Sequence, residues 1–95
     1  MEQVVVNKQK KDLLRGEYSA EEAKEIISNF ITQKINFHNM RNYSSQIRYE
    51  RPDENSLIRI EELKESRKSL MELINTAKEE GRTLKIDSTI TIELI

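Results

Sequence analysis

The chain contains no cysteine and no tryptophan, and its 95 residues include only one proline and two glycines. The absence of cysteine excludes disulfides, thiolate nucleophiles and cysteine-based zinc sites. No apolar run approaches the roughly 20 residues of a membrane span, and the first residues lack the basic start and apolar stretch of a signal peptide. We therefore expect a cytoplasmic protein without disulfide or thiol chemistry.

An excess of charge of one sign is also lacking, since 16 basic side chains stand against 17 acidic ones. A net charge of −1 creates no overall field that would draw the protein to nucleic acid or to an anionic membrane. Charged residues nevertheless make up 35% of the chain, and hydrophobic residues make up 36%. This composition is typical of long helices with a solvent-facing side, in a single domain with a thin core.

Signals for helix ends divide the middle of the chain into two helices. Ser19 followed by Glu22 forms the pattern of a capping box, which predicts a helix start at the next residue after the serine. Pro52 disfavours helical backbone before it and suits the first turn of a new helix, and Gly81 is a typical helix end. The sequence thus predicts two helices of similar length, over residues 20–49 and 53–80.

The apolar stripes of these helices predict an antiparallel hairpin. Folding the chain at Pro52 sets side by side residues whose numbers sum to about 104, so that Phe30 meets Ile74 and Met40 meets Leu63. The stripes then stay in phase along both helices, as in a coiled coil. The stripe predicted to line the first helix consists of Ala23, Ile26, Phe30, Phe37, Met40 and Ile47.

A second apolar line on the first helix has no place in this hairpin. Ile27, Ile31 and Ile35 follow one another at four-residue spacing, and Met71 lies off the main stripe of the second helix. A two-helix hairpin has only one inner face. These residues therefore predict a further interface, either with the strands or with a second copy of the chain.

Arg67 interrupts the stripe of the second helix opposite Phe37. One interpretation is that its guanidinium stacks on that ring or meets a carboxylate of a partner chain. The interpretation that we favour is that Arg67, with Gln33, fixes the register or the oligomeric state, as polar residues at such positions do in coiled coils.

The hydrophobic period changes to two after Gly81. Alternating apolar residues from Leu84 to Leu94 predict one continuous strand over 83–94, with one covered face and a bulge near Asp87. A lone strand is not stable in water, so it needs an edge to pair with. The other β-like run of the chain, residues 3–6, is its expected partner, and a symmetry mate could close the sheet.

The lysine-rich residues between this run and the first helix suggest a connector, with a short helix at 10–14 that ends at Gly16. The chain is thus predicted to be one α+β domain, mainly α, in the order strand, helix, helix, strand. Its predicted parts are the N-terminal strand and basic connector at 1–18, the helical hairpin at 19–81 and the C-terminal strand at 82–95.

The tip of the predicted hairpin is rich in groups that contact phosphates and stack on bases, and a second basic cluster precedes the first helix. The competing interpretation, which we favour, is that cations at a helix C-terminus face the negative end of its dipole. In the predicted fold the clusters lie at opposite ends of a helix about 45 Å long, so only an assembled form would join them. The candidate nucleic-acid contacts are Lys8, Lys10, Lys11, Arg41, Tyr43, Arg48 and Arg51.

No constellation of catalytic or metal-binding residues stands out. His38 is the only histidine, whereas a zinc site needs three or four ligands. The serines lack the pattern of a nucleophile elbow, and neither glycine belongs to a phosphate-binding loop. We therefore predict a protein without catalytic residues, cofactor or metal.

The sequence favours a small non-catalytic protein-interaction and assembly module that self-associates through its helical hairpin and strand. The favoured oligomer is a homodimer. A nucleic-acid-associated regulator is the alternative, and an enzyme comes third. The predicted oligomer or partner interface comprises Ile27, Ile31, Ile35, Arg67, Met71, Ile90, Ile92 and Leu94.

Overall fold

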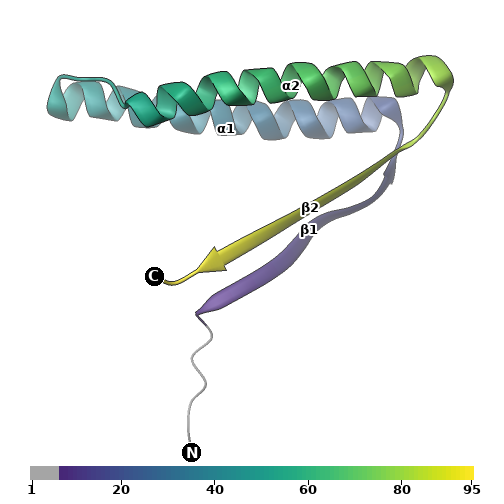
Figure 1. Ribbon diagram of the computed structural model, residues 1–95, viewed down its shortest axis with the longest axis horizontal. Coiled ribbons are helices and arrows are strands. Elements are labelled where there is room, and N and C mark those ends of the chain that lie inside the picture. The colour runs from purple at the N-terminus through teal and green to yellow at the C-terminus, as the bar shows by residue number, and fades with distance from the viewer. Residues whose placement is uncertain (1–6) are drawn as a thin grey trace, which may run out of the picture.

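A computed structural model describes residues 7–95 of the chain. Its elements are strand β1 (Lys8–Tyr18), helix α1 (Ala20–Tyr49), helix α2 (Glu54–Glu80) and strand β2 (Leu84–Glu93). The helices form a hairpin, and the strands pair as a two-stranded antiparallel ribbon (Figure 1). This arrangement confirms the predicted α+β fold, mainly helical, with a hairpin at its centre.

The helix ends follow the predicted local signals. Ser19 Oγ accepts a hydrogen bond from the Glu22 amide at 3.1 Å, and the Glu22 carboxylate accepts one from the Ser19 amide at 3.0 Å. The backbone amide of Ser19 first, and its hydroxyl second, lower the pKa of Glu22. Gly81 ends α2 in the left-handed conformation, with φ of 65°. Capping therefore sets the bounds of the hairpin at its base.

The turn of the hairpin differs from the predicted one, because α1 runs on past the start of α2 (Figure 1). Glu50 adopts a left-handed φ of 54°, and the chain then doubles back along α1. The Asp53 amide donates to Asn42 Oδ1 at 2.9 Å, so α2 begins level with Asn42. The predicted pairing, in which opposed residue numbers sum to about 104, is therefore wrong, and Ile47 is left 63% exposed beyond the start of α2.

The inner face of α1 is the second apolar line, not the stripe that was predicted. Ile31 is only 4% exposed, whereas its neighbour Phe30 is 55% exposed. Ile27 packs against the core cluster, and Ile35 is partly buried. The line that was expected to meet a partner thus faces α2 within one chain.

The two ends of this line explain the rotation of α1. At the base it begins with the small residues Ala20 and Ala23, which are both buried and let the helices approach closely. Ala23 also belongs to the predicted stripe, and its burial is as predicted. Near the tip the second apolar line continues through His38, which lies 3.3 Å from Ser56 Oγ on α2. Periodicity alone could not distinguish the two lines, because both repeat every three or four residues.

The inner face of α2 is the predicted stripe. Ile60, Leu63, Ile74 and Ala77 are all buried. Arg67 is partly buried on the same stripe, four residues after Leu63. Its predicted role in fixing register stays a prediction.

Strand β1 occupies the segment that was predicted to be a connector. It pairs with β2 from Lys8 opposite Glu93 to Tyr18 opposite Leu84, so the predicted helix at 10–14 is wrong. The long partner strand satisfies the backbone groups of this lysine-rich segment, and that pairing overrides its weak β-propensity. The predicted strand at 3–6 lies outside the described residues.

A single irregularity interrupts the ribbon, and it lies on β1. Asp12 is opposite Thr89 and Leu14 is opposite Ser88, which leaves Leu13 as the extra residue of a bulge. The bulge predicted near Asp87 is therefore on the other strand, at almost the same level of the ribbon. β2 itself is continuous, as predicted.

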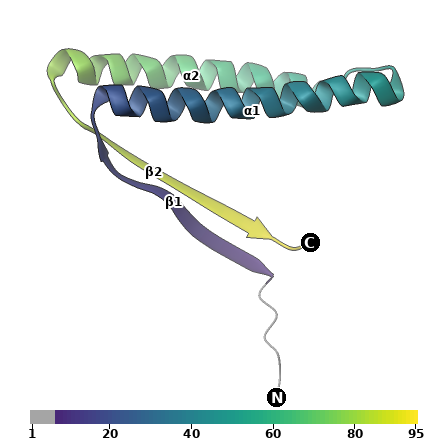
Figure 2. The same ribbon diagram turned by 180° about the vertical axis from the view of Figure 1, so that it is seen from behind.

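The ribbon leaves the base of the hairpin at an acute angle, and the two diverge along most of the length of the ribbon (Figures 1 and 2). Of the described hydrophobic residues of the ribbon, only Tyr18, Leu84 and Ile86 pack against the small core cluster at the base. The molecule measures 51 × 48 × 15 Å and has a radius of gyration of 17.9 Å. A compact domain of this length has a radius of about 12 Å, so this chain is unusually open.

We predict that Ile31→Ala lowers the free energy of unfolding by about 2 to 5 kcal/mol, because it leaves a cavity between the helices. The matched control is Ile58→Ala, the same change at a residue of α2 that is 60% exposed, which should cost less than about 0.5 kcal/mol. Urea unfolding followed by circular dichroism measures both. Equal losses in the two variants would show that Ile31 does not face α2.

Candidate interaction surface

The ribbon is amphipathic, with one apolar and one charged face. Residues directly opposite each other in an antiparallel pair point to the same side, so the register assigns every side chain to a face. On what we call the inner face, β2 contributes only one polar residue, Ser88. The apolar residues of the inner face on β2 and just after it are Leu84, Ile86, Ile90, Ile92 and Leu94.

The bulge at Leu13 places Lys8, Lys10 and Asp12 of β1 on the other side, the outer face, while Lys11 lies on the inner face opposite Ile90. Because it shifts the alternation by one residue, Lys8, Lys10 and Asp12 all lie opposite odd-numbered residues of β2. Thr89 Oγ1 donates to Asp12 Oδ1 at 3.1 Å across the outer face, which agrees with this assignment. Without the extra residue these charged side chains would point to the inner face.

The hairpin covers the inner face of the ribbon over only part of its length. Leu84 and Ile86 are partly buried against the hairpin base. Beyond them the exposed fraction is 40% at Ile90, 69% at Ile92 and 72% at Leu94. The structure therefore brings together the three predicted interface residues of the last strand as one exposed apolar surface.

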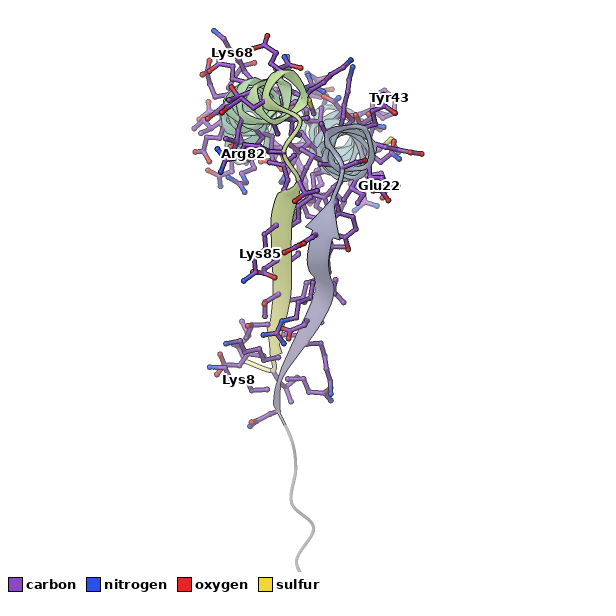
Figure 3. All side chains as sticks on the ribbon, turned by 90° about the vertical axis from the view of Figure 1, so that its right-hand side faces the viewer. Lys8, Glu22, Tyr43, Lys68, Arg82 and Lys85 are labelled. Carbon is purple, nitrogen blue, oxygen red and sulfur yellow. The ribbon has the colours of Figure 1, made fainter. Side chains whose placement is uncertain are left out.

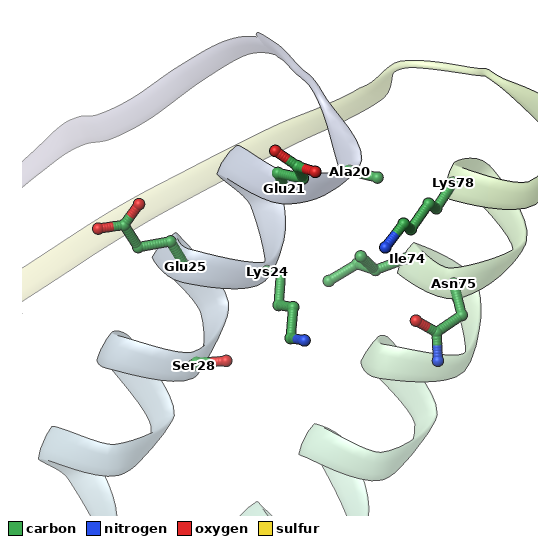
Figure 4. A pocket seen from close by; sticks show the side chains of 8 residues that line it. All are labelled: Ala20, Glu21, Lys24, Glu25, Ser28, Ile74, Asn75 and Lys78. Atoms are coloured by element: carbon green, nitrogen blue, oxygen red, sulfur yellow. The ribbon is translucent and has the colours of Figure 1, made fainter.

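The hairpin turns a polar face away from the ribbon. Figure 4 shows a groove on that face, with the strands passing behind the helices. Its lining residues are Ala20, Glu21, Lys24, Glu25, Ser28, Ile74, Asn75 and Lys78. The exposed apolar side chains of α1 and α2 therefore lie on other faces of the two helices.

These apolar side chains lie on the side of the ribbon. Helical residues two positions apart in the sequence are separated by about 200° of rotation around the helix axis. Phe30 therefore points nearly opposite to Ser28, and Leu73 points nearly opposite to Asn75. Phe30 and Leu73 are both more than half exposed, and Phe37 continues the line of Phe30. The hairpin and the ribbon thus present apolar surfaces toward the same open angle (Figures 1 and 2).

The remaining predicted interface residues belong to the interior of the chain. Ile27, Ile31 and Ile35 face α2, and Met71 packs against the core cluster. Sequence reasoning missed the exposed stripe of α1 as an interaction surface because it placed that stripe inside. Its exposed apolar residues are Phe30, Phe37, Met40 and Ile47.

Two of the candidate nucleic-acid contacts share a groove near the hairpin tip. Arg41 and Arg48 line it together with Phe37 and Tyr49. The Arg41 guanidinium lies 5.4 Å from the centre of the Phe37 ring, within range of a cation–π interaction. Arg51 lines a separate hollow at the turn. The tip thus combines cations with aromatic rings.

The other candidates lie apart from this groove. Tyr43 points to the outer side of α1 in Figure 3, away from α2. The N-terminal lysines lie along the free part of the ribbon, with Lys8 and Lys10 on the outer face and Lys11 opposite Ile90 on the inner face. They were expected beside the base of α1, and β1 instead carries them away from it.

A polar network inside the hairpin joins α1 to the start of α2. Ser56 is only 3% exposed, and its hydroxyl donates to Asp53 Oδ2 at 3.0 Å. His38 Nδ1 lies 3.3 Å from the same hydroxyl oxygen, and it must donate there because the serine proton is already directed to Asp53. In a catalytic triad the histidine instead accepts the serine proton. This network therefore holds the helices together and does not activate Ser56.

Sequence reasoning treated His38 as structural but did not find its partners. The available signal was Asp53 three residues before Ser56, the spacing of an N-cap residue and the amide it binds. In residues 7–95, no group of three or more histidine and acidic side chains is arranged to hold a metal ion. In that same part of the chain, no helix combines the length and the apolar character needed to cross a membrane.

Comparison with known proteins found no match to a protein-family model, to a curated protein or to a solved structure. The surfaces of the chain itself are therefore the basis for inferring its function.

We predict that Ser56→Ala destabilises the protein by about 1 to 3 kcal/mol, because it leaves His38 and Asp53 without their shared partner. Ser69→Ala, at an exposed position of the same helix, is the control and should change stability by less than about 0.5 kcal/mol. Thermal and urea unfolding measure both variants. A neutral Ser56→Ala would mean that the network does not hold the hairpin.

Proposed function

We propose that the protein is a small, non-catalytic, cytoplasmic assembly module that acts by self-association of its hairpin and ribbon, with a homodimer as the basic unit. The observation that supports this most directly is the ribbon itself. It is a sheet of two strands, and helices cover its inner face only as far as Ile86. An isolated two-stranded sheet is marginally stable in water, so the free part of the ribbon needs a further layer or further strands.

The exposed apolar area is sufficient for a stable dimer. The contributing residues are Phe30, Phe37, Met40, Leu70, Leu73, Ile90, Ile92 and Leu94, each between 38% and 72% exposed. At such fractions a large apolar side chain presents on the order of 100 Å², so the set supplies on the order of 800 Å² per copy, the area that each partner buries in a standard interface. A net charge of −1 leaves little overall repulsion between two copies.

We predict that light scattering on the full chain gives a solution mass of twice 11.2 kDa. Ile92→Lys should shift the mass toward the monomer, because it places a charge in the exposed apolar surface of the ribbon. Thr91→Lys is the matched control, since it introduces the same side chain one residue away on the outer face. It should keep the mass of the dimer.

A monomeric mass for the unmodified chain at every concentration would contradict the proposal. Equal mass shifts in the two lysine variants would contradict the assignment of the inner face as the associating surface.

A nucleic-acid-associated function is the second candidate, and the tip groove favours it. Arg41 and Arg48 provide charge for phosphates, while Phe37 and Tyr49 provide rings on which bases stack. The chain as a whole carries a net charge of −1, so no overall positive field supports this function. Self-association therefore has the stronger support.

For this second function we predict binding of single-stranded DNA that weakens steeply between about 50 and 200 mM salt. The double variant Arg41→Ala with Arg48→Ala should reduce both the affinity and the salt dependence. A control with Arg59→Ala and Lys68→Ala changes two exposed cations of α2 that lie outside the groove. Absence of binding at low salt removes the second function, and fluorescence anisotropy measures each case.

A further inference from the structure

We infer that two copies join through the free edges of their β2 strands, in antiparallel orientation, around a twofold axis at Thr89. The product is a four-stranded sheet in the order β1-β2-β2-β1, with the twofold axis between the two central strands. This inference rests on the proposed self-association and specifies the strand edge and the register that produce it.

The two edges of the ribbon are unequal. The β1 edge carries the bulge at Leu13 and the lysines at positions 8, 10 and 11, which are devices that proteins use to prevent unwanted strand pairing. The β2 edge has a continuous register from Leu84 to Glu93, without glycine or proline. It includes the run Thr89 to Ile92, in which β-branched threonine and isoleucine alternate. Its composition and regular backbone make β2 the edge that favours a new strand.

The backbone groups on the free edge of β2 follow from one hydrogen bond. The Leu94 amide donates to the Asn7 carbonyl at 2.6 Å, so the N–H and C=O of Leu94 point toward the β1 side. Successive residues of a strand alternate in this direction, and the pairing of β2 has no irregularity on its own side. The amides and carbonyls of Thr89, Thr91 and Glu93 therefore point outward, where a second copy meets them.

The inner face restricts the registers of this new pairing. Opposed residues point to the same face, and the apolar residues of β2 are all even-numbered. Even-numbered residues of one copy must therefore lie opposite even-numbered residues of the other. Any other register would place apolar side chains of one copy beside charged side chains of its partner.

Charge selects one register among those that remain. With Thr89 opposite the same residue of the partner, Lys85 lies opposite the partner's Glu93, and the symmetry provides this pair twice. With Ile90 opposite the same residue of the partner, Asp87 would lie opposite the partner's Glu93, and these like charges would repel each other. Within one strand, Lys85 Nζ already lies 3.7 Å from Asp87 Oδ2. That ion pair is well exposed and therefore weak, so it does not prevent Lys85 from pairing with the partner's Glu93.

The next allowed register in the other direction sets Ser88 opposite the same residue of the partner. It places Lys85 opposite the partner's Thr91, so both ion pairs across the twofold axis are lost. The register centred on Thr89 also aligns β2 with its counterpart over almost its whole length.

The same register supports the free end of each ribbon. It sets Ile92 opposite the partner's Ile86 and Leu94 opposite the partner's Leu84. Ile86 and Leu84 are the residues of β2 that pack at the hairpin base. Leu73, exposed on the ribbon side of α2 near that base, then lies close to the free end of the partner's ribbon. The exposed end of one copy thus extends the covered base of the other.

Single cysteine variants test the register, because the chain has no cysteine of its own. In Thr89→Cys the two thiols lie opposite each other at the twofold axis, with Cα atoms about 5.5 Å apart, a distance that a disulfide spans. In Thr91→Cys the two thiols lie about 13 Å apart along the strands. We expect Thr89→Cys to form a covalent dimer at least about tenfold faster under mild oxidation, as measured by gel electrophoresis without reductant.

The possible failures of this experiment are distinguishable. A dimeric mass by light scattering with equal cross-linking at both positions contradicts the inferred register but leaves self-association in place. A monomeric mass, with slow cross-linking at both positions, contradicts the inference and the proposed function together.

Proline substitution tests the edge independently. Thr91→Pro removes an outward N–H from the free edge of β2, and it should convert the dimer to monomer. Lys10→Pro removes an outward N–H from the β1 edge at a comparable local cost and should leave the dimer intact. The opposite result, with loss of the dimer only in Lys10→Pro, would assign association to β1.

Discussion

A two-stranded ribbon depends for its stability on whatever covers it, and in this protein only its base is covered. The contact is small because it is made where the helices end, by the cluster of Ala20, Ala23, Ile74 and Ala77. Alanines at this position let the strands approach the helices closely, but they bury little area. The remaining ribbon projects from the hairpin, and this one junction explains the open shape, the exposed apolar surfaces and the proposed need for a second copy.

The two helices of the hairpin are in contact over most of the length of α2, unlike the ribbon, which is covered only at its base. Its apolar contacts run from the base to Ile60, and its tip is joined by the polar network of His38, Ser56 and Asp53. A polar network at this level restricts which residues lie opposite each other, because its hydrogen bonds need one alignment of the helices. The register role of Arg67 stays a prediction. The helices therefore form a stable support, from which the ribbon extends as the element available for assembly.

Much of the fold could be predicted from local chemistry, while the choice of partners could not. The capping box, Pro52 and Gly81 predicted the helix bounds, and the period of two predicted β2 and its apolar face. The inner face of α1 was misassigned because its two apolar lines have the same period, and only contacts at both ends of α1 distinguish them. β1 was missed because its lysines and Gly16 disfavour a strand, whereas its pairing with β2 decides the matter.

Amide hydrogen exchange of the unmodified protein tests the central claim, that β2 gains a second strand partner from another copy. The amides of Ile90 and Ile92 point toward β1 and should be protected at any concentration. The amides of Thr89, Thr91 and Glu93 point to the free edge, and their protection should increase with protein concentration. Free-edge amides that exchange as fast as exposed backbone at every concentration would contradict this account.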